Sequence, residues 1–179
     1  MFSRDDTALV LIDIQGRLAT LMHEQQRLYN SLEILVKGMN ILKIPMIWME
    51  QVPSSLGPTV KEVSDLMGHS TPIAKNTFSC CDSEEFMNEF NRLGRSGILL
   101  AGIETHICVY QTAADLVEKG CRVKVVEECV SSRTLNNKQI GLEAIKGIGG
   151  TVTSCEMILF ELMKSTEAEG FKEIVRLIK

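Results

Sequence analysis

Short runs that are apolar at almost every position alternate along the chain with longer stretches whose apolar residues recur every three or four positions. An uninterrupted apolar run predicts a strand buried on both faces, and the longer spacing predicts an amphipathic helix. The predicted strands are Thr7–Asp13, Ile44–Glu50, Ile73–Lys75, Gly97–Gly102, Arg122–Val126 and Gly150–Val152. The predicted helices are Leu28–Leu42, Asp82–Leu93, Thr105–Lys119, Asn137–Gly147, Ser154–Met163 and a last helix that follows Thr166.

Local signals mark several boundaries of these elements. Asp82 and Ser83 are residue types that cap helix N-termini, and they stand directly before an amphipathic stretch. Thr166 with Glu169 three residues later has the pattern of a capping box. The segment Gln51–Thr59 is rich in Pro, Gly and Ser, which favours a loop.

The order of the elements predicts the fold class. Buried strands that alternate with helices form a parallel sheet with right-handed crossovers and helices on both faces. We therefore expect a three-layer, doubly wound α/β fold with a mostly parallel, Rossmann-like sheet, in one domain over residues 1–179. In such folds, ligands bind at the carboxyl ends of the strands.

Composition and charge narrow the class of partner. The net charge of −4 argues against a nucleic-acid binder, which normally carries a basic surface. The longest apolar runs, such as Ala8–Ile12 and Ile98–Ala101, are far shorter than the roughly 18 residues of a membrane helix. The N-terminus has no signal-peptide core, so we expect a cytoplasmic protein whose six cysteines are reduced thiols.

Three reactive side chains follow predicted strands: Asp13, Lys75 and, in the first turn of the next helix, Cys108. A helix N-terminus and a nearby ammonium both favour a thiolate, so we expect the pKa of Cys108 to be lowered. Asp13 could accept the thiol proton, and the amides of residues 105–108 could hold an oxyanion. The spacing alone leaves open that Cys108 is a buried packing residue and Asp13 a turn former.

Local sequences favour the catalytic interpretation. ALVLIDIQ (8–15), the isolated Lys75 in IAKNTFS and AGIETHICV (101–109) resemble, in this order, the three-part motif of the isochorismatase-like cysteine hydrolase superfamily. The segments EQVPSSLGPTV, SSR and FKEI resemble its isochorismatase-domain-containing subgroup. The resemblance covers nearly the whole chain, and its specificity comes from the combination of the three parts.

The resemblance implies a role for each matched position. Asp13 matches the family's catalytic acid and base, Lys75 its catalytic lysine and Cys108 its nucleophile. A cis peptide bond is implied at Ile103–Glu104, where it would turn the amides of Thr105 and Cys108 toward an oxyanion. The implied reaction is thiolate attack on an amide or related carbonyl, followed by hydrolysis of a thioester.

Departures from the family pattern bear on metals and cofactors. Nicotinamidase-like members have an Asp-x-His metal motif after the second strand, where this chain has Trp-Met-Glu-Gln (48–51). The nearest histidine, His69, has no metal-binding partner beside it in sequence. We therefore expect no metal and no cofactor.

Other residues are candidates for substrate contact or for packing. We expect Gln15, Gln51, Leu56 and Phe78 to line a substrate pocket, because they lie at or beside the same strand ends. His106 stands two residues before Cys108 and so cannot share its helical face. It is a candidate for a substrate contact or for a surface or interface position. The other five cysteines are predicted to be packing residues.

The prediction from sequence is thus a hydrolase that acts on a small-molecule amide, with two alternatives. A vinyl ether hydrolase of the isochorismatase type would need no cysteine nucleophile. A binding or scaffold protein could keep the pocket without catalysis, since fold does not imply function. We also expect a homo-oligomer, because the family commonly assembles and the last helix has an apolar face.

Overall fold

The computed structural model describes residues 1–68 and 70–179, so His69 lies outside the described residues. Six strands form one sheet in the order β3-β2-β1-β4-β5-β6, and every pairing is parallel. This is the strand order of a doubly wound sheet, so the predicted fold class is confirmed. The strands are β1 (Thr7–Ile12), β2 (Met46–Gln51), β3 (Ile73–Lys75), β4 (Gly97–Ile103), β5 (Arg122–Ser131) and β6 (Thr151–Thr153).

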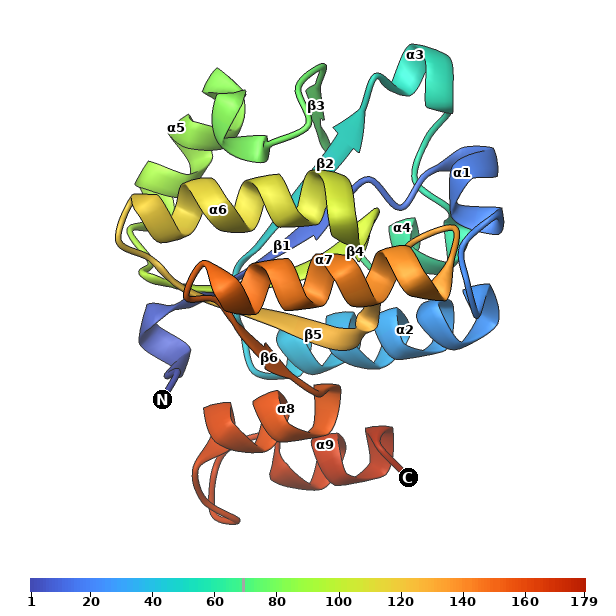
Figure 1. Cartoon of the computed structure of the whole chain (residues 1–179). Helices are drawn as coiled ribbons and strands as arrows, with labels where there is room; N and C mark the ends of the chain where they lie inside the picture. The colour runs from blue at the N-terminus through green and yellow to red at the C-terminus, as the bar shows by residue number, and fades with distance from the viewer. Residues whose placement is uncertain (69) are drawn as a thin grey trace.

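Helices cover both faces of the sheet (Figure 1). One layer contains α2 (Gln25–Ile41), α4 (Lys61–Ser64), α8 (Cys155–Met163) and α9 (Phe171–Leu177), and the other contains α5 (Glu84–Leu93), α6 (Tyr110–Glu118) and α7 (Leu135–Gly147). The remaining short elements are η1 (Arg4–Asp6), α1 (Gly16–Thr20), α3 (Pro53–Leu56), η2 (Cys80–Asp82) and the π-helix η3 (Thr105–Val109).

Strand β1 shows why the sheet holds two separate cores. All six of its residues are buried. Leu9 and Leu11 pack in the cluster that includes α2 and α8, whereas Val10 and Ile12 pack in the cluster that includes α6 and α7. Successive side chains of a strand point to opposite faces, so an uninterrupted apolar run fills both layers. Because helices cover both faces of the sheet, the functional residues lie at the ends of its strands.

The carboxyl ends of β1 and β4 lie side by side in the middle of the sheet, where the strand order reverses. Gly102 of β4 makes this close approach possible. Its φ is +125°, and a Cβ there would lie 2.0 Å from the Ile12 carbonyl oxygen. Asp13 follows β1 and Glu104 follows β4, so both are placed at the crevice where doubly wound folds bind ligands.

Several boundaries differ from the sequence-based prediction. Ser83 caps α5 as predicted, since its side chain accepts from the Phe86 N–H. The capping box at Thr166 is wrong: α9 begins later, after Gly170, whose φ of +88° makes the turn. Segment 51–59 is not all loop, because Pro53 starts the short helix α3. The short helices α1 and α4 were not predicted, because four or five residues show too little periodicity.

The last helix also differs in its packing. Ile174 of α9 is fully buried, and α9 packs on α2 within the same chain. Its apolar face is therefore covered without a second subunit, which removes one reason for expecting an oligomer. Among the described residues, no helix combines the length and apolar character required to cross a membrane.

Candidate active site

Asp13 stands immediately after β1 and turns the chain away from the sheet. Its φ is +55°, in the left-handed region that Asp tolerates better than most residues. The side chain is buried, and its Oδ2 accepts a hydrogen bond of 2.7 Å from the Lys75 ammonium. Burial raises the pKa of Asp13 above its ordinary value, although the positive charge of Lys75 opposes this rise. Its other oxygen, Oδ1, is buried without a hydrogen-bond partner among the described residues.

Lys75 ends β3, and none of its side chain is exposed. Besides Asp13, its Nζ donates to Gln51 Oε1 at 2.5 Å and to the carbonyl oxygens of Thr77 and Phe78 at 3.0 and 3.2 Å. A buried ammonium needs such a set of acceptors, because an unpaired charge in a protein interior is very costly. Lys75 therefore fixes the positions of both Asp13 and Gln51.

Cys108 lies in the π-helix η3, directly after β4, and is 7% exposed. Burial, together with the neighbouring Asp13 carboxylate, raises the pKa of the Cys108 thiol to about 12, even though Lys75 acts in the opposite direction. The expectation of a lowered thiol pKa is therefore wrong. Desolvation of a thiolate in this pocket outweighs the helix terminus and the ammonium. The resting side chain is a neutral thiol next to the carboxyl group of Asp13.

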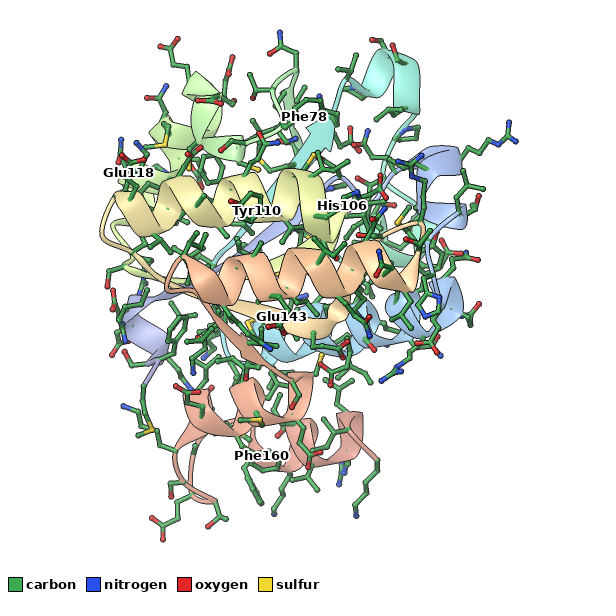
Figure 2. The ribbon with its side chains drawn as sticks, viewed as in Figure 1. Phe78, His106, Tyr110, Glu118, Glu143 and Phe160 are labelled. Carbon is green, nitrogen blue, oxygen red and sulfur yellow. The ribbon has the colours of Figure 1, made fainter. Side chains whose placement is uncertain are left out.

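These side chains meet at a small cavity of about 140 Å³. Cavities for drug-sized ligands are typically about 300–1,000 Å³, so this one fits only a small molecule. Seven residues predicted for the site line it: Asp13, Gln51, Leu56, Phe78, Ile103, Glu104 and Cys108. Phe78 is 57% exposed, and Figure 2 shows it at the outer edge of the molecule near β3.

The segment before Cys108 is held from two sides. The peptide bond Ile103–Glu104 is cis, at the bond where the resemblance implied one. The Glu104 carboxylate accepts from the backbone N–H and the guanidinium of Arg133, at 3.0 and 3.2 Å. On the other side α7 packs closely, because a Cβ at Gly141 would lie 2.7 Å from the His106 nitrogen. The N–H groups of Ile107 and Val109 already donate to the Glu104 carbonyl, so they are not free to bind an oxyanion. An oxyanion role for the N–H groups of Thr105 and Cys108 stays a prediction.

Besides Lys75, which lies behind Asp13, two predicted site residues do not line the cavity. Gln15 is fully buried, and its amide bonds to the backbone of Gln51 and Gly57. It supports Gln51 instead of facing the cavity. Thr105 is also fully buried. His106, whose role was left open, pairs its Nδ1 with Ser132 Oγ at 2.9 Å, outside the cavity lining.

Sequence reasoning missed two apolar walls of the cavity and two supporting residues. Leu18 lies on α1, which has no clear sequence signal, and Ile107 immediately precedes the thiol. Arg133 and Gly141 support the site through contacts with Glu104 and His106, which lie about 30 residues earlier in the chain. The serine-rich SSR segment and the glycine inside a predicted helix were the only local hints.

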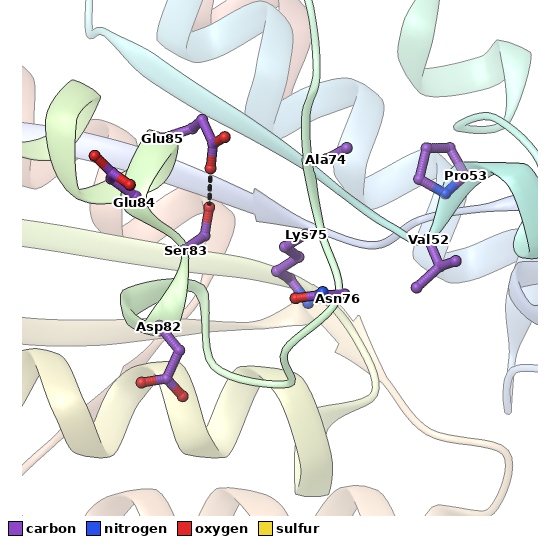
Figure 3. A pocket seen from close by; sticks show the side chains of 9 residues that line it. All are labelled: Val52, Pro53, Ala74, Lys75, Asn76, Asp82, Ser83, Glu84 and Glu85. Carbon is purple, nitrogen blue, oxygen red and sulfur yellow. Dashed lines mark hydrogen bonds between the residues drawn. The ribbon is translucent and has the colours of Figure 1, made fainter.

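A larger hollow of about 380 Å³ lies on the other side of Lys75 (Figure 3). Its lining includes Asp82, Ser83 and Glu85, and Ser83 Oγ donates to Glu85 at 3.2 Å. It shares no lining residue with the smaller cavity. Because the thiol, the carboxylate and the amide meet only at the smaller cavity, we assign the candidate active site there.

Metal ligation finds no support in the part of the chain that the structure describes. No group of three or more His, Cys, Asp or Glu side chains in that part is arranged to hold an ion. Glu50, at the position of the nicotinamidase-like motif, instead accepts from the Thr59 N–H and hydroxyl at 2.6 and 2.7 Å. The absence of a resident metal or cofactor stays a prediction.

Comparison with known proteins places this geometry in a family. Isochorismatase domain-containing protein 1 from Danio rerio is 37% identical over 145 residues, which cover 81% of this chain and 51% of that protein. The structure of MAR1 ribonuclease from Caenorhabditis elegans is 30% identical, with a TM-score of 0.92 over 99% of this chain and 91% of that one. The YcaC gene product from Escherichia coli, described as an octameric hydrolase of unknown specificity, shares the fold. It is 20% identical, with a TM-score of 0.93 over 99% of this chain and 88% of that one. The family model described as the isochorismatase domain matches residues 7–157, and the chain belongs to the isochorismatase family of hydrolases.

Proposed function

We propose that this protein is a cysteine hydrolase that cleaves a small amide, or a similar carbonyl compound, through a thioester on Cys108. The observation that carries the proposal is the meeting of Asp13 and Cys108 at one small cavity, with Lys75 bonded to Asp13. The three residues come from three different strand ends. A thiol next to a proton acceptor that a third group orients is an arrangement that can carry out nucleophilic acyl transfer, and Lys75 is that third group.

The proposed first half-reaction begins from the neutral thiol. Cys108 Sγ attacks the carbonyl carbon while its proton passes to Asp13, so that no free thiolate has to persist in the buried site. The carbonyl electron pair moves to oxygen, which backbone N–H groups at the start of η3 stabilise. When the intermediate collapses, the C–N bond breaks and Asp13 returns the proton to the leaving amine. The product is a thioester on Cys108.

The second half-reaction reverses these roles. Water attacks the thioester carbonyl and gives a proton to Asp13, the C–S bond breaks, and the proton returns to the sulfur. The carboxylic acid leaves, and the neutral thiol is restored. Lys75 keeps Asp13 oriented throughout and opposes the rise of its pKa, which keeps the carboxylate able to accept a proton.

The thiol also favours amide cleavage over the alternative vinyl ether hydrolysis, which needs no cysteine nucleophile. Cys108 lines the cavity together with Asp13. Among the described residues that line it, only Asp13 has a buried side-chain oxygen without a hydrogen-bond partner. A purely binding role would not require this pairing. The ribonuclease activity in the name of the nematode relative is not extended to this chain, because no Lys, Arg or His that could bind a phosphate is among the described residues that line the cavity.

The test is a panel of small primary amides incubated with the full chain, followed by measurement of ammonia and of intact protein mass. We expect turnover, and we expect a transient acyl adduct that maps to Cys108. The Cys108→Ser variant should form neither thioester nor product at a measurable rate. Turnover of a vinyl ether that persists in Cys108→Ala would overturn the proposal, as would a panel without any turnover or adduct.

We also propose that the protein assembles into a homo-oligomer and acts in the cytoplasm. Large apolar side chains are exposed on α8, namely Met157 at 64% and Phe160 at 37%. Phe160 on α8 lies on the opposite side of the view from Phe78, so such an interface would leave the cavity mouth open (Figure 2). Light scattering of the purified chain tests this, and a monomer at micromolar concentration would contradict it.

A further inference from the structure

The side-chain amide of Gln51 has a fixed orientation in the cavity. An ammonium only donates hydrogen bonds, so the atom that faces Lys75 must be the amide oxygen. The amide nitrogen, Nε2, therefore points away from Lys75. It makes no hydrogen bond to any residue that the structure describes, and Gln51 lines the cavity. The cavity wall thus presents a hydrogen-bond donor that still lacks an acceptor.

The backbone around this donor is held equally firmly. The Gln51 N–H donates to Gln15 Oε1 at 2.6 Å, and its carbonyl accepts from Gln15 Nε2 at 3.2 Å. The next residue, Val52, has a φ of +37°, which is a strained value for a β-branched residue. Its N–H donates to the Lys75 carbonyl at 2.8 Å, so the surrounding structure enforces the turn. A donor fixed in this way loses little entropy when it binds a ligand.

Asp13 provides the opposite polarity next to this donor. Asp13 and Gln51 bond to the same Lys75 nitrogen, so their terminal groups are neighbours. Oδ1 of Asp13 is buried and has no hydrogen-bond partner among the described residues, which leaves an acceptor beside the free donor of Gln51. A carboxamide carries one group of each kind, because its oxygen accepts and its nitrogen donates. A carboxylate would instead place a negative oxygen against Asp13.

The rest of the lining restricts charge and size. Leu18, Leu56, Phe78, Ile103 and Ile107 form apolar walls, and Glu104 is already paired with Arg133. Among the lining residues that the structure describes, none is Lys, Arg or His. The cavity therefore has hydrocarbon walls and acidic groups. The cations beside it, Lys75 and Arg133, are already paired with Asp13 and Glu104 and do not line it, so they are not free to bind an anionic substrate.

We infer that Asp13 and Gln51, both fixed by Lys75, form a paired acceptor and donor that selects small neutral carboxamides over the corresponding carboxylates. The carboxamide oxygen faces Gln51 Nε2 with one lone pair and keeps the other for the N–H groups of η3, while its nitrogen faces Asp13 Oδ1. A short apolar chain contacts the walls. Gln51 is then the specificity-determining residue. This inference rests on the proposed function for its biological meaning, but binding of the carboxamide can be tested without turnover.

The test compares iodoacetamide with iodoacetate, which differ only in the amide and carboxylate groups. The alkylation rate of Cys108 with each reagent is measured by peptide mass spectrometry, and the ratio of the two rates is divided by the same ratio for glutathione. We expect the normalised preference for iodoacetamide to be at least about tenfold. In Gln51→Met it should fall by at least about threefold, because one neutral hydrogen bond is lost.

Gln26→Met is the matched control, because it makes the same substitution in an exposed glutamine of α2, whose Nε2 donates to Asn30 Oδ1 at 3.0 Å. It should leave the preference unchanged. Where Gln51→Met does not fold, Gln51→Glu keeps an oxygen for Lys75 and should still slow iodoacetamide by at least about threefold. A wild-type ratio equal to that of glutathione, or no change in the Gln51 variants, would overturn the inference.

The two proposals fail in different ways. Selective alkylation of Cys108 without hydrolysis of any amide would contradict the proposed function and leave the carboxamide selectivity intact. Hydrolysis of amides together with an unselective Cys108 would contradict the selectivity alone.

Discussion

Two regions of this molecule each bury a cysteine sulfur, and their surroundings differ. Cys108 lies at the cavity beside Asp13, whereas Cys129 lies in the core on the other face of the sheet, with its sulfur 3.2 Å from that of Cys155. Burial raises the pKa of both Cys108 and Cys129. Cys155 in turn donates to the Ser31 carbonyl at 3.6 Å.

The two regions differ in whether a proton acceptor lies next to the thiol and whether a small ligand can reach it. Next to Cys108 are a carboxylate, held by an ammonium, and a cavity large enough for a small ligand. Cys129 is completely buried and faces another thiol. A raised pKa therefore does not distinguish a packing cysteine from a candidate nucleophile. The neighbouring proton acceptor and the access of a substrate do.

The largest effect that tests this comparison is loss of the sulfur itself. Cys108→Ser should reduce amide turnover by about 10³-fold or more, because removal of a nucleophile abolishes the covalent route. Cys129→Ser should retain turnover within a few-fold, although it places a hydroxyl in an apolar core. Steady-state ammonia release measures both. Equal losses in the two variants would remove the distinction between the two regions.

The buried ion pair between Lys75 and Asp13 should make a large difference to the free energy of unfolding. Lys75→Met leaves the Asp13 carboxylate buried without its cation, which should lower the free energy of unfolding by ~3–5 kcal/mol at pH 7. Lys75 opposes the rise of the Asp13 pKa, so this pKa is higher still in the variant. The folded variant then takes up a proton as the pH falls, and its deficit relative to wild type should shrink. Urea denaturation at several pH values measures this.

Lys146→Met is the control for that experiment. Its Nζ also lies 2.7 Å from a carboxylate oxygen, that of Glu143, but both side chains are at least half exposed. An exposed pair contributes at most about 1 kcal/mol, so the variant should stay close to wild type at every pH. A similar loss in both lysine variants would contradict the argument from burial.

Gly141→Ala should disturb the Cys108 region from a distance. The added methyl group meets the backbone between Thr105 and His106, so η3 has to move. A displacement of about 1 Å can cost about 100-fold in rate, and we expect a loss of this order in kcat/KM. Gly147→Ala, at the end of the same helix, meets open space and should leave kinetics unchanged. Intact activity in Gly141→Ala would show that the close contact does not position the thiol.

The smallest effect concerns the pH dependence of alkylation. Because the pKa of Cys108 is raised to about 12, the fraction of thiolate should increase by about tenfold per pH unit, without a plateau below pH 10. Cys129, which is fully buried, should stay unmodified over the same range in the folded protein. Iodoacetamide labelling, resolved by peptide, measures both. A plateau of Cys108 labelling near pH 8 would indicate a lowered pKa and contradict the raised pKa of this thiol.

The sequence by itself determined the doubly wound sheet and the strand ends that carry chemistry. Apolar runs such as Gly97–Gly102 can be satisfied only by burial on both faces, and this local property does not depend on distant residues. Parallel strands bring their carboxyl ends to one edge, so the positions of Asp13, Lys75 and Cys108 along the chain were enough to group them. Seven of the ten predicted site residues line the cavity.

Only the tertiary structure decided the electrostatics and the supporting contacts. The pKa of Cys108 depends on how deeply the thiol is buried and on the charge of Asp13, and neither quantity is local in sequence. Gln15 was expected at the cavity but braces Gln51, because its amide is within reach of that backbone only after β1 and β2 pair. The close contact at Gly141 likewise depends on how two helices pack. Desolvation and packing are sums over neighbours that the fold brings together, so the sequence pattern could locate the reactive groups but not their protonation or their support.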